Sequence, residues 1–165
     1  MNDLVQQFQY KQWANLEILD SIEALAVTAN SDDARMALRI LNHTYVVDSI
    51  FRSRIIGATP EFTGTNTEAT PAVEELRSSV ASMDAWFIEF VGQLSPSRLD
   101  RQLHFTFTDG DAGCMSVREI LTHLIVHGAY HRGAAGRLLL QNSVPPPKDL
   151  FTRFLHELEP DRRQH

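Results

Sequence analysis

The sequence predicts an all-α protein, an antiparallel four-helix bundle with a short β-hairpin-like excursion before the fourth helix and a short C-terminal helix. Four long segments repeat apolar residues at helical spacing, and one short segment before the last of them alternates instead. No internal repeat or linker divides the chain, and 165 residues suit one domain. We therefore expect a single domain over residues 1–158 and a frayed tail over residues 159–165.

The first two helices are predicted by apolar periodicity and by their end signals. Apolar residues recur at helical spacing from Leu4 to Leu25. A second helix is expected from Ser31-Asp32-Asp33, which offers capping groups and acids in the first turn, to Gly57. The Thr-rich residues 58–70 lack this period and predict a surface loop.

The third helix and the hairpin come next. Thr70-Pro71 is typical of a helix start, and the apolar period continues to about Leu94. In residues 101–113 apolar and polar residues alternate and then run into a Gly-rich turn, which predicts a short strand. A second short strand is expected at Cys114–Met115.

The C-terminal part of the domain should begin with the fourth long helix. Ser116 with Glu119 forms a capping-box pattern in front of a periodic segment over residues 117–141. Three consecutive prolines at residues 145–147 predict an extended connector, and residues 148–158 predict the last helix.

Composition excludes several classes of function. The formal net charge of −6 argues against a general nucleic-acid binder. The N-terminus lacks the basic and apolar run of a signal peptide, and no segment approaches the roughly 20 apolar residues of a membrane span. The single cysteine, Cys114, allows no internal disulfide. We expect a cytoplasmic protein with neither nucleic-acid nor membrane partners.

Three histidines share one helical stripe: His123, His127 and His131 are spaced four residues apart. The outer two are roughly 12 Å apart along the axis, so only an adjacent pair can bind one ion. His43, near the apolar face of the second helix, is a candidate third ligand. A set of packed histidines without a metal remains an alternative, and Cys114 remains a candidate fourth ligand.

Several stretches resemble the DinB family, in the wider DinB/YfiT-like group of metal-binding four-helix bundles. Residues 10–20 (YKQWANLEILD) are similar to its first helix, and Leu41-Asn42-His43 with Asp48 is similar to its second. Residues 122–133 (THLIVHGAYHRG) resemble its most specific motif. Where many members have glutamine after this motif, the chain has Ala134.

The resemblance implies a metal, zinc or nickel, held by His43, His127 and His131, with His123 as a neighbour. It also implies an antiparallel four-helix bundle that is often a homodimer. Relatives include thiol-dependent S-transferases and a mycothiol-dependent isomerase. A low-molecular-weight thiol or another small molecule is therefore an expected partner.

Three neutral imidazoles leave an open position on zinc, which is typical of catalytic sites. We expect a metal-dependent thiol S-transferase or a related hydrolase. The alternative is a non-catalytic, metal-stabilised stress-response or interaction module that acts as a dimer. The candidate pocket or outer-shell residues are His123, Tyr45, Asp48, Tyr130 and Arg132. Asp48 can instead pair with Arg52 at i+4. For Tyr45 and Tyr130 the alternative is a role in core packing. Arg132 can bind an anionic group or form a surface salt bridge.

Overall fold

The computed structural model describes residues 3–28 and 31–163, and most of them are helical. The long helices are α1 (Asp3–Thr28), α2 (Ser31–Ile56), α3 (Val73–Gly92) and α5 (Val117–Gln141). The short ones are α4 (Pro96–Leu99), α6 (Phe151–Leu158) and a 3-10 helix, η1 (Pro160–Arg163). Strands β1 (Gln102–Thr106) and β2 (Ala112–Ser116) form an antiparallel pair. A mostly helical fold with one small hairpin is thus confirmed.

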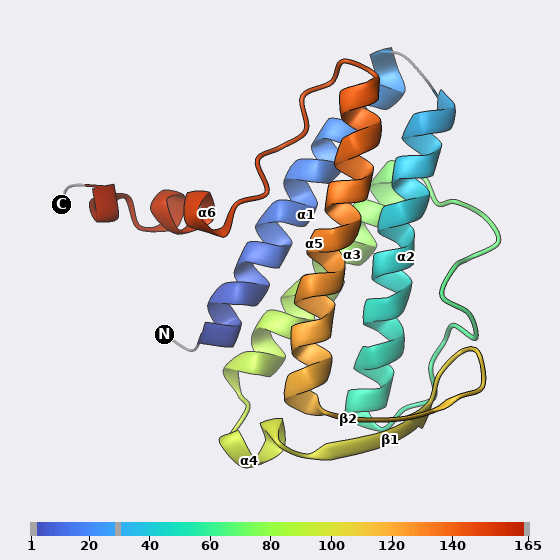
Figure 1. The fold of residues 1–165 in the computed structure, drawn as a ribbon, viewed down its shortest axis with the longest axis vertical. Coiled ribbons are helices and arrows are strands. Elements are labelled where there is room, and N and C mark those ends of the chain that lie inside the picture. The colour runs from blue at the N-terminus through green and yellow to red at the C-terminus, as the bar shows by residue number, and fades with distance from the viewer. Residues whose placement is uncertain (1–2, 29–30, 164–165) are drawn as a thin grey trace.

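The direction of the helices depends on the loop of residues 57–72. This loop returns along the length of α2, so α3 starts at the same end of the molecule as α2 (Figure 1). α2 and α3 therefore run in the same direction, whereas α1 and α5 run in the opposite one. The loop allows this parallel arrangement, because a connection of this length can span a whole helix.

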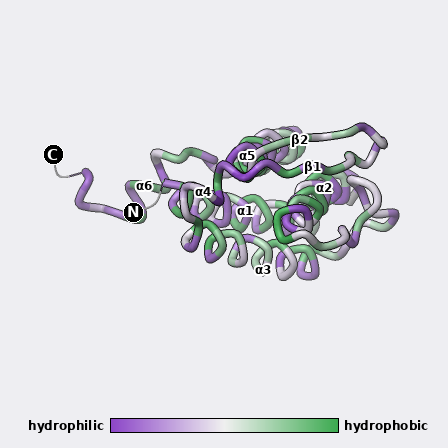
Figure 2. Tube along the Cα trace, turned by 90° about the horizontal axis from the view of Figure 1, so that it is seen from below, coloured by the Kyte–Doolittle hydropathy of each residue, from purple (hydrophilic) through white to green (hydrophobic). Residues whose placement is uncertain are grey.

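α1 and α2 lie between the other two long helices. Each of them contacts both α3 and α5. Figure 2, which views the helices from their lower ends, shows α3 and α5 on opposite sides of this pair. The side chains of α2 and α5 consequently face each other along their length, which is the arrangement needed for a shared site.

Two apolar clusters fill the two ends of the helical core. The cluster near the hairpin includes Phe8 and Phe87, whose rings stack at 5.2 Å, together with Phe51. The other cluster includes Leu19 and Leu139 and lies at the opposite end. Between them along the helices lies a layer of buried polar side chains, and burial of such groups requires partners. Its main members are Lys11, Asn15, Asp48, Asp84 and Arg132.

The hairpin leads directly into α5. The Ser116 side chain accepts a hydrogen bond from the Glu119 backbone N–H, and the Glu119 carboxylate accepts one from the Ser116 N–H, so the predicted capping box is present. On the inner side of the hairpin, the Phe105 ring covers Gly113, where a Cβ atom would lie 2.6 Å from the ring. Glycine at this position is what allows the ring to pack there.

Several element ends differ from the sequence predictions. α3 begins three residues after Thr70, and its N-cap is Ala72 with no side-chain cap, because Thr70-Pro71 belongs to the loop. The helix α4, with proline in its first turn, was not predicted. Part of the tail expected to fray is the 3-10 helix η1. His165 and the Ser31 side chain lie outside the described residues.

No helix in the described part of the chain combines the length and apolar character of a membrane span.

Candidate metal centre

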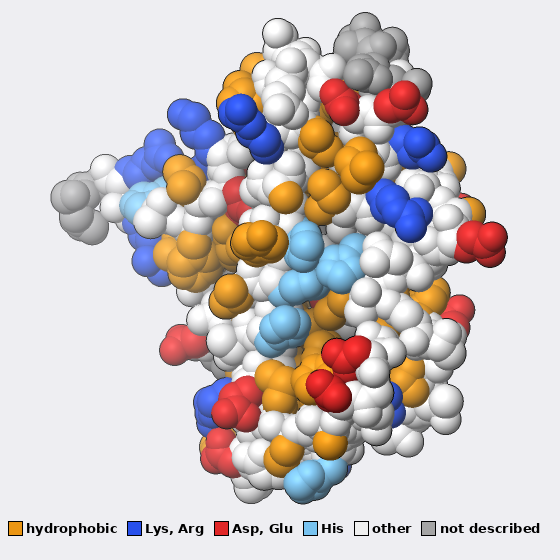
Figure 3. Space-filling model, turned by 45° about the vertical axis from the view of Figure 1, so that its right-hand side comes forward, with side chains coloured by type: hydrophobic (Ala, Val, Ile, Leu, Met, Phe, Trp, Pro, Cys, Tyr) orange, Lys and Arg blue, Asp and Glu red, His pale blue; other side chains and the backbone are white. Residues whose placement is uncertain are grey.

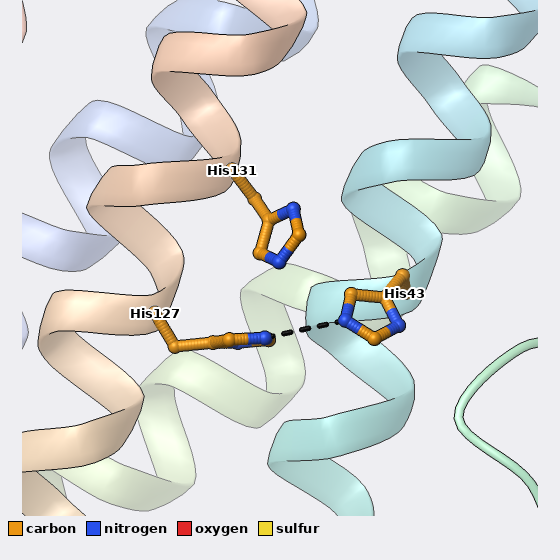
Figure 4. A group of neighbouring side chains, drawn as sticks. All are labelled: His43, His127 and His131. Carbon is orange, nitrogen blue, oxygen red and sulfur yellow. Dashed lines mark hydrogen bonds between the residues drawn. The ribbon is translucent and has the colours of Figure 1, made fainter.

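Three histidines from two facing helices meet at one point. His127 and His131 project from the same face of α5, one turn apart, and His43 projects toward them from α2 (Figure 4). One ring nitrogen from each lies within 4.8 Å of the other two. Figure 3 shows histidine side chains gathered near the middle of one face, so this group reaches the surface.

The orientation of His43 is set by the loop that crosses α2. Its Nδ1 lies 2.8 Å from the backbone oxygen of Thr65, which can only accept, so Nδ1–H donates this hydrogen bond. Nε2 is then the atom with a free lone pair, and it lies 3.2 Å from Nε2 of His127. Two nitrogens on one tetrahedral zinc ion are about 3.4 Å apart, so this spacing fits a shared ion.

The lowered pKa values of two histidines in the cluster are also compatible with binding of a cation. The pKa of His127 is lowered to about 3, mainly by burial and also by the nearby His131, His123, His43 and Lys11. Burial also lowers the pKa of His131, and His43 adds to that effect. Both imidazoles are therefore neutral at ordinary pH, as metal ligands must be. The chemistry of the donor set and its spacing match a divalent metal.

A buried ionic cluster lies behind the histidines. Lys11 Nζ lies 2.6 Å from both Asp48 Oδ2 and Asp84 Oδ1. Burial lowers the pKa of Lys11, but the two carboxylates outweigh this effect and the pKa is raised. Burial raises the pKa of Asp48 to about 6, although Lys11 opposes the rise.

Gly128, next to His127 on α5, lies beside two buried cationic side chains. A Cβ atom on Gly128 would lie 3.5 Å from Lys11 Cε and 3.1 Å from an Arg132 guanidinium nitrogen. The distance to Lys11 is an ordinary contact, so alanine at this position would require only a small shift of the Arg132 guanidinium. The Lys11 ammonium lies behind the candidate site, where Asp48 and Asp84 compensate its charge.

Of the predicted pocket residues, His123 contacts the three-histidine group through His127. Its ring stacks on His127 with centroids 5.0 Å apart and meets the edge of Phe51, and burial lowers the pKa of its imidazole. It does not belong to the group of converging nitrogens. Tyr45 packs between the core and the loop, with its ring 6.1 Å from Phe62.

Tyr130 and Asp48 are placed differently from the sequence predictions. Tyr130 is 75% exposed, so a core role for it is wrong, although its ring touches His131. Asp48 pairs with Lys11 and not with Arg52, whose guanidinium lies over the Trp86 ring. Arg52 therefore makes a cation–π contact with Trp86, and Asp48 forms its ion pair with the buried Lys11.

Arg132 and Cys114 are also placed away from the converging nitrogens. Arg132 is buried and binds Asp149 and Asn15, so it forms neither a surface salt bridge nor a contact with the open side of the site. Asp149 also accepts a hydrogen bond from the Tyr10 hydroxyl. Cys114 is exposed on β2 beside His104. It is not part of the histidine group.

Two residues of the site were missed from the sequence. Thr65 contributes only its backbone oxygen, so its side chain carries no signal. Lys11 did carry one, because a lysine among apolar positions of an amphipathic helix must find buried partners. Its partners, however, come from α2 and α3, which sequence spacing does not relate to α1.

The fold and the three histidines together define a class, that of helical proteins with a histidine cluster compatible with metal binding. Comparison with known proteins places the chain within this class. The profile of the DinB family matches residues 1–162, so the chain belongs to the DinB family. It is similar to Protein DinB of Bacillus subtilis (strain 168), with 24% identity over 145 residues, 81% of this chain and 83% of the relative.

Proposed function

We propose that this protein binds one divalent metal ion, zinc or nickel, through His43, His127 and His131 and uses the open side of the site for chemistry on a small molecule. The observation that carries the proposal is the convergence of three imidazole nitrogens within 4.8 Å, two of them on imidazoles whose pKa is lowered. Three histidine ligands leave zinc one free position, as in catalytic sites.

The reaction we propose is transfer of a low-molecular-weight thiol to an electrophile. A bound metal would stabilise a thiolate at neutral pH or lower the pKa of a water molecule. The protein's own groups support this role. Thr65 holds His43 in the tautomer that presents Nε2, the nitrogen that lies 3.2 Å from Nε2 of His127. Hydrolysis by a metal-bound hydroxide is the second enzymatic version of the proposal.

A non-catalytic role is the alternative from another class. In this version the metal joins α2 to α5 and stabilises a stress-response or interaction module that acts as a homodimer. The shallow opening beside His43 and His131 favours the catalytic version, because a purely structural zinc site is closed by four protein ligands. We further propose that α1, α2, α3 and α5 form a four-helix bundle, which the contacts among these helices support. We also propose that the protein is cytoplasmic.

The metal content of protein purified without a histidine tag tests the site. We expect about one zinc or nickel ion per chain in elemental mass spectrometry. His43→Ala, His127→Ala and His131→Ala should each lose it. His123→Ala, which removes a neighbouring imidazole outside the group, is the matched control and should keep it. A wild-type protein that takes up no metal after reconstitution would overturn the site.

Turnover separates the catalytic from the structural version. Common thiols should react with electrophilic acceptors faster in the presence of the metal-loaded protein, and removal of the metal by a chelator should abolish the gain. Stoichiometric metal with no gain for any thiol or ester, together with a large loss of thermal stability on chelation, would favour the non-catalytic module.

A further inference from the structure

A shallow depression of about 320 Å³ opens directly onto the histidine cluster. Its walls combine two of the clustered imidazoles with one basic, one amide and two apolar side chains. They are His43, His131, Arg39, Asn66, Met36 and Ile40. A small molecule in this depression contacts two proposed metal ligands and the Arg39 side chain at once. Figure 3 shows hydrophobic and basic side chains beside the histidines on this face.

Arg39 is placed by the helix that carries His43. The two residues are four apart on α2 and so share a face, about 6 Å apart along the axis. The Arg39 guanidinium makes one long hydrogen bond, 3.5 Å, to the backbone oxygen of Glu68. Within residues 3–28 and 31–163 it pairs with no carboxylate. This differs from Arg77, which pairs with three acids, and from Arg153, which pairs with two.

The charge around the depression favours an anion. No acidic side chain belongs to its lining, whereas Arg39 adds a permanent positive charge. Met36, which is 50% exposed, and Ile40 add apolar surface to the same depression. The matching ligand has a metal-binding group at one end, a short aliphatic segment and an anionic group that Arg39 can bind.

We propose that Arg39 binds a carboxylate of the substrate, so that the site takes small thiols that carry a carboxylate in preference to neutral thiols. This inference rests on the proposed function, because the thiol end must reach the metal held by the three histidines. Arg39 acts here as a specificity-determining residue. A guanidinium presents two parallel N–H donors to a carboxylate, a geometry that a neutral thiol cannot use.

Cobalt-substituted full-length protein provides the test, because a thiolate bound to cobalt gives a charge-transfer absorption band. The band is titrated with 3-mercaptopropionate and with 2-mercaptoethanol. We expect the wild type to bind the carboxylate-bearing thiol about tenfold more tightly, as one charge-assisted interaction allows. In Arg39→Gln this preference should fall to about one, and Arg39→Lys should restore part of it.

Arg35→Gln is the matched control, since Arg35 lies one turn earlier on α2 and pairs weakly with Asp32 at 3.7 Å. It removes the same charge and should keep the preference. Equal binding of both thiols by the wild type, or an unchanged preference in Arg39→Gln, would overturn the inference and leave the metal site standing. A protein that binds no cobalt would overturn the proposed function, and the inference with it.

Discussion

Replacement of the buried lysine is the sharpest test of the polar layer behind the histidines. Lys11 is 1% exposed and its ammonium group lies 2.6 Å from one oxygen of Asp48 and one of Asp84. Lys11→Met keeps the length and the apolar stem of the side chain but removes the charge. The two carboxylates, which are also buried, then face each other without the cation between them.

The expected loss follows from the burial of the group. Removal of one partner from a buried ion pair costs about 3–5 kcal/mol, because an uncompensated charge remains in the interior. Domains of this kind have a free energy of unfolding of roughly 5–15 kcal/mol, so the variant should fold but with much less stability. With a urea slope of about 2 kcal/mol/M, a loss of about 4 kcal/mol lowers the midpoint by about 2 M.

The loss should depend on pH in a defined direction. The pKa of Asp48 is already raised to about 6, and the opposing effect of Lys11 disappears in the variant, so this pKa rises further. Because the pKa of Asp48 is raised in the folded state, its contribution to the free energy of unfolding is fully present below the unfolded-state pKa of 3.8. This contribution is lost as the pH rises through the folded-state pKa. Lys11→Met should therefore be more destabilised at about pH 8 than at about pH 5.

Urea unfolding of the metal-free protein, followed by circular dichroism at both pH values, gives the free energies. Lys148→Met, at the exposed second lysine of the chain, is the matched control and should change stability by less than about 0.5 kcal/mol. Lys11→Met/Asp48→Asn should recover part of the loss, because one buried carboxylate is removed. A loss below about 1 kcal/mol at the higher pH would refute the reasoning.

Three further perturbations test other parts of the structure. Gly113→Ala places a methyl group 2.6 Å from the Phe105 ring, which packs against Phe51, and should cost about 1–3 kcal/mol in urea unfolding; a neutral effect would show that the ring moves freely. Ser116→Ala removes the cap of α5 and should cost about 1 kcal/mol, with Ser97→Ala as an exposed control. Because the pKa of His127 is lowered, the metal-free protein should lose stability as the pH falls from 6.5 toward 3. In unfolding curves measured across this pH range, His127→Leu should show a weaker pH dependence than the wild type. An equally steep dependence would contradict the lowered pKa.

Local signals predicted the helical elements well. The apolar period located the four long helices, and the Ser116–Glu119 pattern located the start of α5 to the residue. The same logic failed at Thr70-Pro71, where a typical cap sequence lies in the loop and α3 starts later. Capping signals mark where a helix can begin, but packing of Leu76 and Val80 into the core decides where it does.

The histidine group was predicted in part by spacing and in part by the family resemblance. The i,i+4 pair on α5 follows from helix geometry alone, because one turn places His127 and His131 on one face. The approach of His43 depends on how α2 packs against α5. The sequence suggested this packing through the resemblance and not through any local pattern. Whether the three residues bind a metal stays a prediction.

The sequence by itself determined the four long helices, the cap of α5, the hairpin and the histidine stripe, since each depends on residues within a few positions of one another. The tertiary structure decided the direction of α3, the contact of Thr65 with His43, the pairing of Lys11 with two distant aspartates and the exposure of Arg39 beside the site. These features depend on which faces of separate helices pack together. The observed packing minimises the exposed apolar area and the unpaired buried charge of the whole chain, so it cannot be deduced from any single segment.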